Sequence, residues 1–429
     1  MAARRGSPGT RQHDHRPPTV TFPLKPRADR RLLGALLRCG ALGLLLSSCT
    51  DFASMRFDAT DAEALHYAQS GDLRAEVDSV VQPLVAQGDT PGVEVGILLP
   101  DGSRRFFGYG VADRDTGRAP DADTLFAIGS LSKGFVGTIA DLLVQEGRLS
   151  WDDTLSEVMP ADAKPSSDAR RITLLQLATH TSGLTRQPYT SPILLPFIRY
   201  LFTGESFYAR LDQDFMLDYL ADFSAPRTVE YEYSNIGYGL LSYAIERKTG
   251  LTIDTLLRRD IVAPLGLTET GYVPEDLSGY AMRAHGYAGD QPKFIRRGEP
   301  VPDWTFTPLM RGSAGLYSSA RDLLIFARAH FAAPDTPLGR AMTDTLRVRL
   351  LRPRESAAIA WTVDNVDGEE ISYMLGVVAG YSSYLGLDVR HRIAIVVLRN
   401  SFSWDESIGG RLLVRLGRAQ DRSAGRFGR

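Results

Sequence analysis

Strand-like segments stand near both ends of the main part of the chain, and a long stretch with helical spacing separates them. Two pairs have strand character, 93–99 with 105–111 and 384–389 with 393–398, and helical patterns at 73–87 and 404–418 flank them. Between the pairs, residues 135–280 and 318–332 are mainly helical in pattern. We therefore expect one sheet built from both chain ends, in an α/β domain of the α+β type, with an inserted helical lobe at about 150–300.

The N-terminal segment is typical of an export signal. Three arginines between 27 and 31 precede the apolar run Leu32–Leu46. This run is too short to favour a membrane span, which needs about 20 apolar residues. Leu46-Ser47-Ser48-Cys49 resembles the bacterial lipobox, whose cysteine is lipidated and becomes the mature N-terminus. We expect an exported lipoprotein that faces the periplasm and is membrane-anchored at Cys49. An ordinary signal peptide with an incidental cysteine is the alternative.

The expected organisation follows from these two patterns. It consists of an N-terminal extension and signal peptide at 1–48, a tether at 49–73, a folded domain at 74–418 and a tail at 419–429. Both cysteines of the chain, Cys39 and Cys49, lie in the N-terminal segment. The folded domain therefore has neither a disulfide nor a thiolate metal site.

The segment FAIGSLSKGFVGTIADLLVQEGRLS, residues 126–150, has catalytic character. Ser130 and Lys133 stand three residues apart at the start of a helical pattern, so their side chains share a face. A lysine desolvated in a cleft has a lowered pKa and can act as the base for a serine nucleophile. The alternative is that Ser130 only caps the helix. The chain has five lysines against 44 arginines, and arginine cannot give up its proton, so a lysine here favours function.

A second polar motif lies in YEYSNIGYGLL, residues 231–241, before a helix that runs to about Lys248. A tyrosine beside an ammonium group can have a lowered pKa, and Tyr233 could then shuttle the serine proton. Asn235 could hold a substrate carbonyl or orient Lys133. The alternative for Tyr233 is a packed loop aromatic.

Together these motifs resemble the β-lactamase-related serine hydrolase superfamily, which includes class C β-lactamases, penicillin-binding D,D-peptidases and related esterases. Four further stretches match in order: LATHTSGL at 177–184, IVAPLGLTET at 261–270, GLYSSARDLLIFA at 315–327 and GYSSYLGLDVRHRIAIVVLRN at 380–400. The resemblance covers about 74–418. It implies an antiparallel sheet flanked by helices, an all-helical lobe across the cleft, and no cofactor. It also implies Ser130 as nucleophile, Lys133 and Tyr233 as proton-transfer groups, and Asn235 as a positioning group.

The third motif of this superfamily is a Lys-Thr-Gly tripeptide on a strand near the C-terminus. The literal Lys248-Thr-Gly falls instead at the end of the helix after Tyr233, where a basic residue and a glycine cap are expected. Counting back from Gly380-Tyr381 places Met374-Leu-Gly376 at the family position. The resemblance puts the oxyanion hole at the backbone N–H groups of Ser130 and Val377. A cation at 374 helps to bind a substrate carboxylate, and methionine cannot do so.

The remaining features narrow the function. The formal net charge of −2 implies no nucleic-acid partner. No His, Asp or Glu cluster has metal spacing, and His180 lies in a family landmark where a structural role is expected. We expect an acyl-serine hydrolase acting on a small acyl substrate or cell-wall peptide, foremost D-alanyl peptides. An ester-hydrolysing relative is the alternative, favoured by Met374, and a catalytically silent cell-wall-binding lipoprotein is the second.

Overall fold

A computed structural model of the chain describes residues 67, 70–88, 90–188, 191–228, 230–332, 335–366, 368–405, 407–423 and 425. The expected signal segment and Cys49 lie outside the described residues. Within the part of the chain that is described, none of the helices has both the length and the apolar character needed to cross a membrane.

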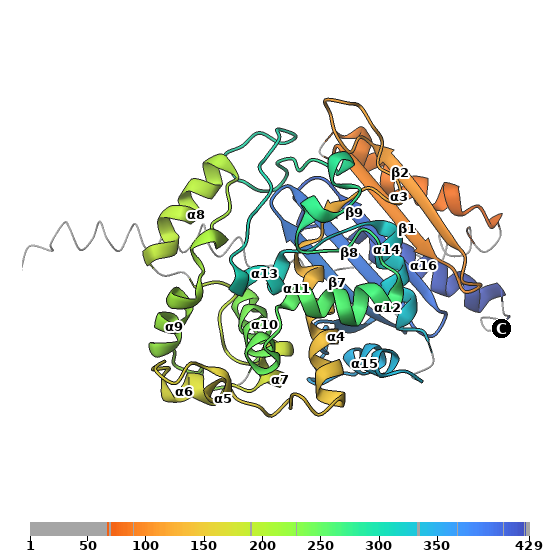
Figure 1. Ribbon diagram of the computed structural model, residues 1–429. Helices are drawn as coiled ribbons and strands as arrows, with labels where there is room; N and C mark the ends of the chain where they lie inside the picture. The colour runs from red at the N-terminus through yellow and green to blue at the C-terminus, as the bar shows by residue number, and fades with distance from the viewer. Residues whose placement is uncertain are drawn as a thin grey trace, which may run out of the picture. The chain divides into compact units, whose positions relative to one another are not determined.

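An antiparallel sheet of seven strands forms the centre of the fold (Figure 1), with the order β2-β1-β9-β8-β7-β6-β5. The strands are β1 (Gly92–Leu98), β2 (Arg104–Gly110), β5 (Ser356–Ala357), β6 (Thr362–Val366), β7 (Glu369–Val378), β8 (Tyr381–Asp388) and β9 (Ile393–Arg399). β1 comes from the start of the domain and pairs with β9 from its end, with Val95 opposite Val397. The prediction that both ends of the chain build one antiparallel sheet is confirmed.

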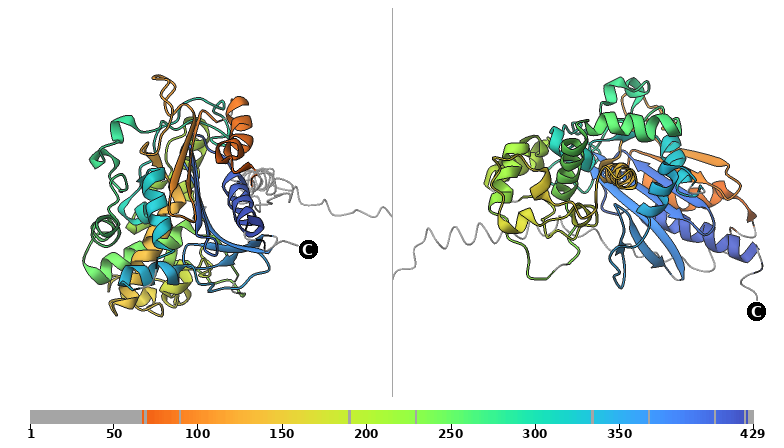
Figure 2. Two further views of the ribbon diagram at one scale, coloured as in Figure 1. Left: turned by 90° about the vertical axis from the view of Figure 1, so that its right-hand side faces the viewer. Right: turned by 60° about the horizontal axis from the view of Figure 1, so that its bottom comes forward.

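Helices cover both faces of this sheet (Figure 2). On one face lie α3 (Leu73–Ala86) and α16 (Ser407–Ser423), which bury Val77 and Leu412 against alternate strand residues such as Val95. On the other face lie α4 (Ser132–Gln145) and α14 (Ala320–Ala329), with α15 (Pro337–Thr345) packed on α4. Because side chains alternate along a strand, each central strand serves both cores and is buried along its whole length.

The helical lobe lies between β2 and the last strands in sequence and occupies the yellow-to-green part of Figure 1. Its α-helices are α5 (Leu155–Val158), α6 (Ser167–Arg170), α7 (Leu174–Ala178), α8 (Ser191–Thr203), α9 (Gln213–Ala221), α10 (Asn235–Thr249), α11 (Ile253–Leu257), α12 (Ala263–Leu265) and α13 (Pro308–Ala314). The short turns are the 3-10 helices η2 (Tyr208–Arg210), η4 (Pro274–Asp276) and η5 (Tyr280–Met282) and the π-helical η3 (Arg258–Val262).

The end of the lobe is less helical than expected. Between 266 and 307 the structure has only η4 and η5 as helical turns. This stretch contains six glycines and four prolines. Glycine loses more conformational entropy than other residues when it enters a helix, and proline lacks the N–H donor that a helix needs. A long irregular segment therefore follows α12 and returns the chain to α13.

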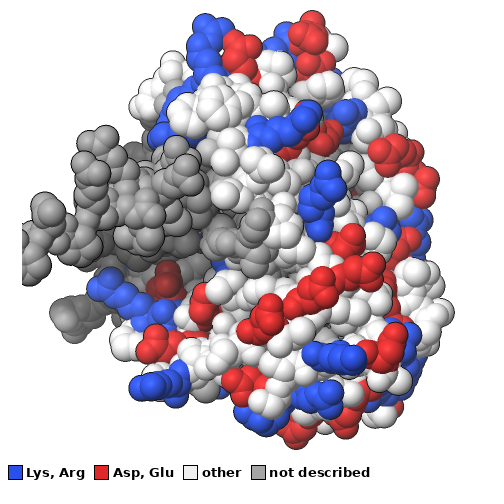
Figure 3. All heavy atoms as spheres, turned by 90° about the vertical axis from the view of Figure 1, so that its left-hand side faces the viewer, with Lys and Arg blue, Asp and Glu red and all other residues white. Residues whose placement is uncertain are grey.

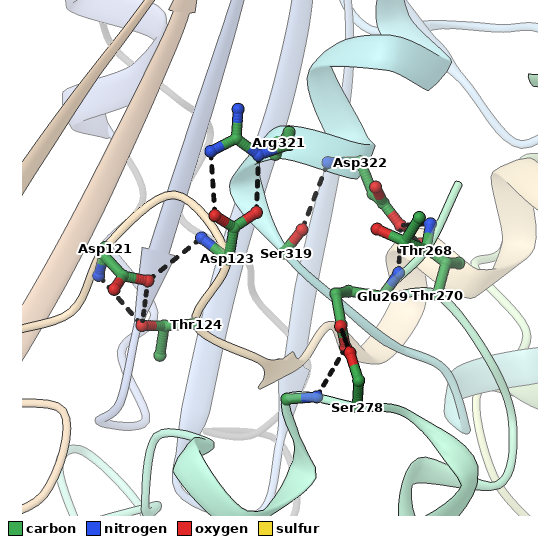
Figure 4. Close-up of polar contacts among 11 residues, drawn as sticks. Asp121, Asp123, Thr124, Thr268, Glu269, Thr270, Ser278, Ser319, Arg321 and Asp322 are labelled. Carbon is green, nitrogen blue, oxygen red and sulfur yellow. Dashed lines mark hydrogen bonds and ion pairs between the residues drawn. The ribbon is translucent and has the colours of Figure 1, made fainter. Parts of the chain in front are cut away.

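Polar side chains at the start of α14 form hydrogen bonds with the beginning of this irregular segment, at 268–270 (Figure 4). The Asp322 carboxylate accepts hydrogen bonds from the backbone N–H groups of Thr268 and Glu269, at 3.0 and 2.7 Å, and from Thr270 Oγ1 at 2.8 Å. The neighbouring Arg321 pairs with Asp123, just before the catalytic segment. These contacts fix the strand pair β3 (Phe126–Ala127) and β4 (Tyr317–Ser318) in place.

Basic and acidic side chains are balanced on the face shown in Figure 3, in agreement with the near-zero net charge of the chain. On the side where α8 and α9 lie in Figure 1, basic and acidic side chains are intermixed over the visible described residues (Figure 3). No broad area of a single sign is visible among the described residues on this face.

Candidate active site

Ser130 stands in a tight turn between a short strand and a long helix. β3 leads into Gly129, whose φ of 51° is left-handed and suits a residue without a side chain. Residues Gly129–Leu131 form the 3-10 turn η1, and α4 begins at Ser132. The Ser132 hydroxyl holds the turn together, because it donates to the Gly129 carbonyl at 2.6 Å and accepts from the Leu316 N–H at 3.1 Å. The sequence predicts Ser130 at the start of the helix. In the structure it lies in the 3-10 turn directly before α4.

Lys133 connects the two halves of the site. Its side chain is 2% exposed. Its Nζ lies 3.0 Å from Ser130 Oγ, 2.9 Å from Asn235 Oδ1 and 2.7 Å from the Ser313 carbonyl. A neutral amine has two N–H donors and one lone pair. Donation to the two carbonyl oxygens therefore leaves the lone pair for the Ser130 hydroxyl proton.

The electrostatics of this pocket favour the neutral amine. Burial lowers the pKa of Lys133 well below its ordinary value of 10.5, and the positive charge of Arg186 lowers it further. A lysine in this state can take a proton from serine, as the sequence analysis expects.

The Tyr233 ring faces the same amine, with Lys133 Nζ 5.0 Å from the ring centroid. The expected lowering of the tyrosine pKa is wrong. Burial raises the pKa of Tyr233, although the charge of Arg186 and a hydrogen bond with Ser130 act in the opposite direction. The phenol therefore stays protonated near neutral pH, which makes it a proton donor and not a phenolate base.

His180 packs against Tyr233 and binds the backbone of the next residue. Its ring lies 4.5 Å from that of Tyr233, and its Nδ1 accepts the Ser234 N–H at 3.1 Å. Burial lowers the pKa of His180 well below its ordinary value, and the charge of Arg186 lowers it further. A neutral imidazole bound to the backbone in this way orients the loop, which agrees with the structural role expected from the sequence.

Asn235 begins α10 and reaches both sides of the site. Its Oδ1 accepts from Lys133, and its Nδ2 donates to the Tyr208 hydroxyl at 2.8 Å. Ser234 caps α10 by accepting the Gly237 N–H at 2.9 Å, which fixes the helix start and so the direction of the asparagine. Tyr208 is a site residue that the sequence analysis missed.

Gly376 and Val377 on β7 lie directly beside the serine turn. A Cβ atom at Gly376 would overlap the Ile128 carbonyl and would lie 3.1 Å from the Ser130 N. A Cβ atom at Gly129 would lie 3.0 Å from the Val377 N. The backbone N–H groups of Ser130 and Val377 therefore belong to one wall, where two donors can face a single developing oxyanion.

Met374 occupies the third-motif position on β7, but it is buried, with 4% exposure. It lies on the same face of the strand as Gly376, and its thioether contacts Gly134 of α4. The side chain at this position is therefore packed against α4, and, as expected from the sequence, it has no donor for a substrate carboxylate.

Lys248 lies at the end of α10, which Gly250 terminates with a left-handed φ of 70°. It forms an ion pair with Asp153 at 3.1 Å. The literal Lys-Thr-Gly tripeptide is thus a helix ending and contributes no strand beside Ser130.

Two other residues at the site were missed because no local pattern marks them. The Ser313 carbonyl belongs to α13 and reaches Lys133 across the fold. The Arg186 guanidinium carbon lies 5.0 Å from the centroid of the Tyr233 ring. Nothing in their own sequence surroundings distinguishes either one from a surface residue.

One group of metal-ligand side chains occurs elsewhere in the described residues. Glu369, His391 and Asp421 place ligand atoms within 4.8 Å of one another. Arg390 already pairs with both carboxylates, at 3.3 and 2.8 Å. Glu369 is eight residues from Val377 along β7, about 26 Å at 3.3 Å per residue, so this group is remote from Ser130.

Comparison with known proteins gives a consistent result. The family model described as "Beta-lactamase" matches residues 77–418. The chain is 28% identical to "Penicillin-binding protein 4" of Amycolatopsis lactamdurans over 63% of this chain and 67% of that one. It is 31% identical to a "Beta-lactamase" of Pseudomonas fluorescens over 64% and 70% of the two chains. The solved structure of D-alanine carboxypeptidase AmpC from Burkholderia cenocepacia superposes with a TM-score of 0.65 at 25% identity, covering 81% of this chain and 99% of that one.

Proposed function

Because the chain belongs to the beta-lactamase family of serine hydrolases, we propose that it hydrolyses small acyl substrates through an acyl-serine intermediate, foremost D-alanyl peptides and related amides. The observation that carries this proposal is the set of three contacts made by the buried Lys133 Nζ. The similarity to a penicillin-binding protein and to a D-alanine carboxypeptidase supports the substrate class.

In the first half of the reaction, the neutral amine of Lys133 takes the proton from Ser130 Oγ as the oxygen attacks the acyl carbon. The carbonyl oxygen becomes an oxyanion that accepts from the N–H groups of Ser130 and Val377. The bond to the leaving group then breaks, and the leaving nitrogen receives a proton from the Tyr233 hydroxyl, which Lys133 reprotonates. The products are the acyl-enzyme and the free amine.

In the second half, a water molecule attacks the acyl carbon and gives up its proton to the same Lys133–Tyr233 pair. The ester bond to Ser130 breaks, the Oγ recovers its proton and the carboxylic acid leaves. Asn235 holds the amine of Lys133 in place in both halves through its 2.9 Å contact.

The test is covalent labelling of the purified protein with a fluorescent penicillin and a fluorophosphonate, followed by peptide mapping of the modified residue. The label should lie on Ser130, and Ser130→Ala should abolish it. Lys133→Ala should slow labelling by roughly 10²–10⁴-fold, the usual contribution of base assistance. Ser423→Ala, on α16, serves as a matched control that keeps full labelling. Full labelling of Ser130→Ala protein would reject the mechanism.

An esterase is the second candidate function, and Met374 is the observation that favours it. The usual cation at that position binds a substrate carboxylate. Met374 is packed on Gly134 and has no donor, so this position gives a carboxylate substrate no advantage over a neutral ester. The kcat/KM values for a D-alanyl-D-alanine peptide and for a neutral acyl ester, measured on the same preparation, decide between the two. A preference for the ester by several orders of magnitude would replace the peptidase proposal.

We also propose that the protein is an exported lipoprotein anchored at Cys49 and facing the periplasm. The lipobox-like Leu46-Ser-Ser-Cys49 supports this, as does the short apolar run before it. Cys49→Ala should block metabolic labelling with a palmitate analogue and leave the precursor uncleaved. A mature N-terminus well downstream of Cys49 would contradict the anchor.

A further inference from the structure

Two arginine–tyrosine contacts lie side by side at the edge of the catalytic residues. Arg186 lies over Tyr233, with its guanidinium carbon 5.0 Å from the ring centroid. Arg352 lies over Tyr231, at 4.4 Å. The His180 ring contacts both tyrosines, at 4.5 and 5.7 Å between centroids, so the four groups form one arrangement around it.

We propose that Arg186 forms a binding subsite for a carboxylate of the substrate, which supplies from the helical lobe the cation that β7 lacks at Met374. This inference rests on the proposed function, because it names the substrate class of the same site.

The position of Arg186 is fixed relative to the catalytic groups. It lies in the segment between α7 and α8, and its own carbonyl accepts the backbone N–H of Asn235 at 3.1 Å. Asn235 in turn holds Lys133. The Arg186 backbone is therefore hydrogen-bonded directly to a residue that contacts the Lys133 amine. Its guanidinium lies over the ring of Tyr233, which also contacts Lys133.

The charge of Arg186 reaches the reacting groups. It is the one charge that acts, after burial, to lower the pKa of Lys133, and it also acts on Tyr233 and His180. Arg352 does not act on Lys133, and on Tyr231 its effect is opposed by the Glu355 carboxylate. Arg186 is therefore the arginine whose field a substrate anion at Ser130 would meet.

The chemistry of guanidinium matches this role. Its planar group presents paired N–H donors to the two oxygens of a carboxylate and is always charged. Arg186 is half-buried, and its guanidinium is already placed over the Tyr233 ring, so it loses little conformational freedom when it binds a carboxylate. Met374, by contrast, has no donor, and its end is packed on Gly134.

The test uses a pair of chromogenic acyl substrates that differ at one group, a free carboxylate in one and its methyl ester in the other. The measured quantity is the ratio of their kcat/KM values. Wild-type protein should prefer the free carboxylate, and Arg186→Gln should lower the ratio by roughly tenfold to a hundredfold, the range for a charge-assisted hydrogen bond. Arg186→Lys should give an intermediate ratio, because it keeps the charge and loses the paired donors.

Arg352→Gln is the matched control, since it removes the same kind of contact from the neighbouring tyrosine, and its ratio should stay that of the wild type. Fluorophosphonate labelling of Ser130 reports whether each variant is folded. If Arg186→Gln does not fold, the fall in ratio for Arg186→Lys decides the question.

A wild-type ratio in Arg186→Gln, or in Arg186→Lys where the first variant does not fold, would overturn the subsite. Hydrolysis of both substrates by the wild type without preference would overturn the subsite alone. A wild type that hydrolyses neither substrate and takes no label would overturn the proposed function, and the subsite with it.

Discussion

The thioether of Met374 lies against Gly134, the residue that follows Lys133 in α4. A Cβ atom at Gly134 would lie 2.6 Å from the terminal methyl of Met374 and 2.7 Å from its sulfur. Gly134 has no side chain, and this leaves the space on α4 that the long Met374 side chain of β7 fills. Packing between β7 and α4 depends on this pair.

The first prediction follows from this packing. Met374→Leu should cost less than about 1.5 kcal/mol of unfolding free energy, because the volume is conserved. Met374→Lys should be clearly more destabilising. The new ammonium group would be buried against Gly134, the residue next to Lys133 in α4. Thermal melts of both variants measure this. A Met374→Lys protein as stable as the wild type and selective for carboxylate substrates would show that the position opens to the cleft.

The second prediction concerns pH. Lys133 acts as a base only when neutral, and burial with the Arg186 charge lowers its pKa. The kcat/KM should therefore be retained near neutral pH and should fall on acidification, as pH drops through the lowered pKa and the amine becomes protonated. In Arg186→Gln, with one lowering influence removed, this acidic limb should move to higher pH. A profile that is the same in both proteins, measured with a neutral ester from pH 5 to 9, would contradict the assignment.

The third prediction concerns the literal Lys-Thr-Gly. Lys248 is 29% exposed and pairs with Asp153 at the end of α10. Lys248→Ala should leave turnover close to the wild type and cost at most about 1 kcal/mol, as expected for a partly exposed ion pair. The kcat/KM and the melting temperature measure this. Loss of turnover with the fold intact would mean that the catalytic strand has been misidentified.

The fourth prediction concerns a charge outside the site. Glu94 is fully buried on β1, and burial, then the nearby Asp121 and Asp123, raise its pKa to about 8. Because the folded-state pKa lies above the unfolded value, this group's contribution to stability is present at low pH and is lost as pH rises toward 8. At pH 7, protonating Glu94 in the folded state lowers the free energy of unfolding by an amount on the order of 3 kcal/mol, because the unfolded carboxyl would be ionised.

Glu94→Gln should therefore melt at a higher temperature than the wild type at pH 8, and the difference should shrink toward pH 5. Glu370→Gln, an exposed carboxylate on β7, is the control and should leave the pH dependence unchanged. Equal slopes of melting temperature against pH in wild type and Glu94→Gln would exclude Glu94 as the titrating group.

The parts of this fold and site that could be predicted from the sequence are those carried by local spacing. Ser130 and Lys133 meet because they stand three residues apart where the turn η1 leads into α4, and alternation marks the strands at both ends. Contacts made by tertiary packing have no such signal. Ser313 contributes a backbone carbonyl, which any residue type could supply, and Arg186 is one of 44 arginines. The burial of Met374 depends on the register of β7 against α4, and the raised pKa of Tyr233 depends on how completely its surroundings exclude water.

The pairing of β1 with β9 has a consequence for how the protein is made. The ribosome releases β1 some three hundred residues before its partner strand, and β7, with one wall of the oxyanion site, also emerges late. Until then the early hairpin has an unpaired edge, and contacts so distant in sequence form slowly. A chain that ends before β7 can already contain Ser130 and Lys133, but it lacks the Val377 N–H on the wall beside Ser130, so we expect no covalent labelling of Ser130 in chains truncated before β7.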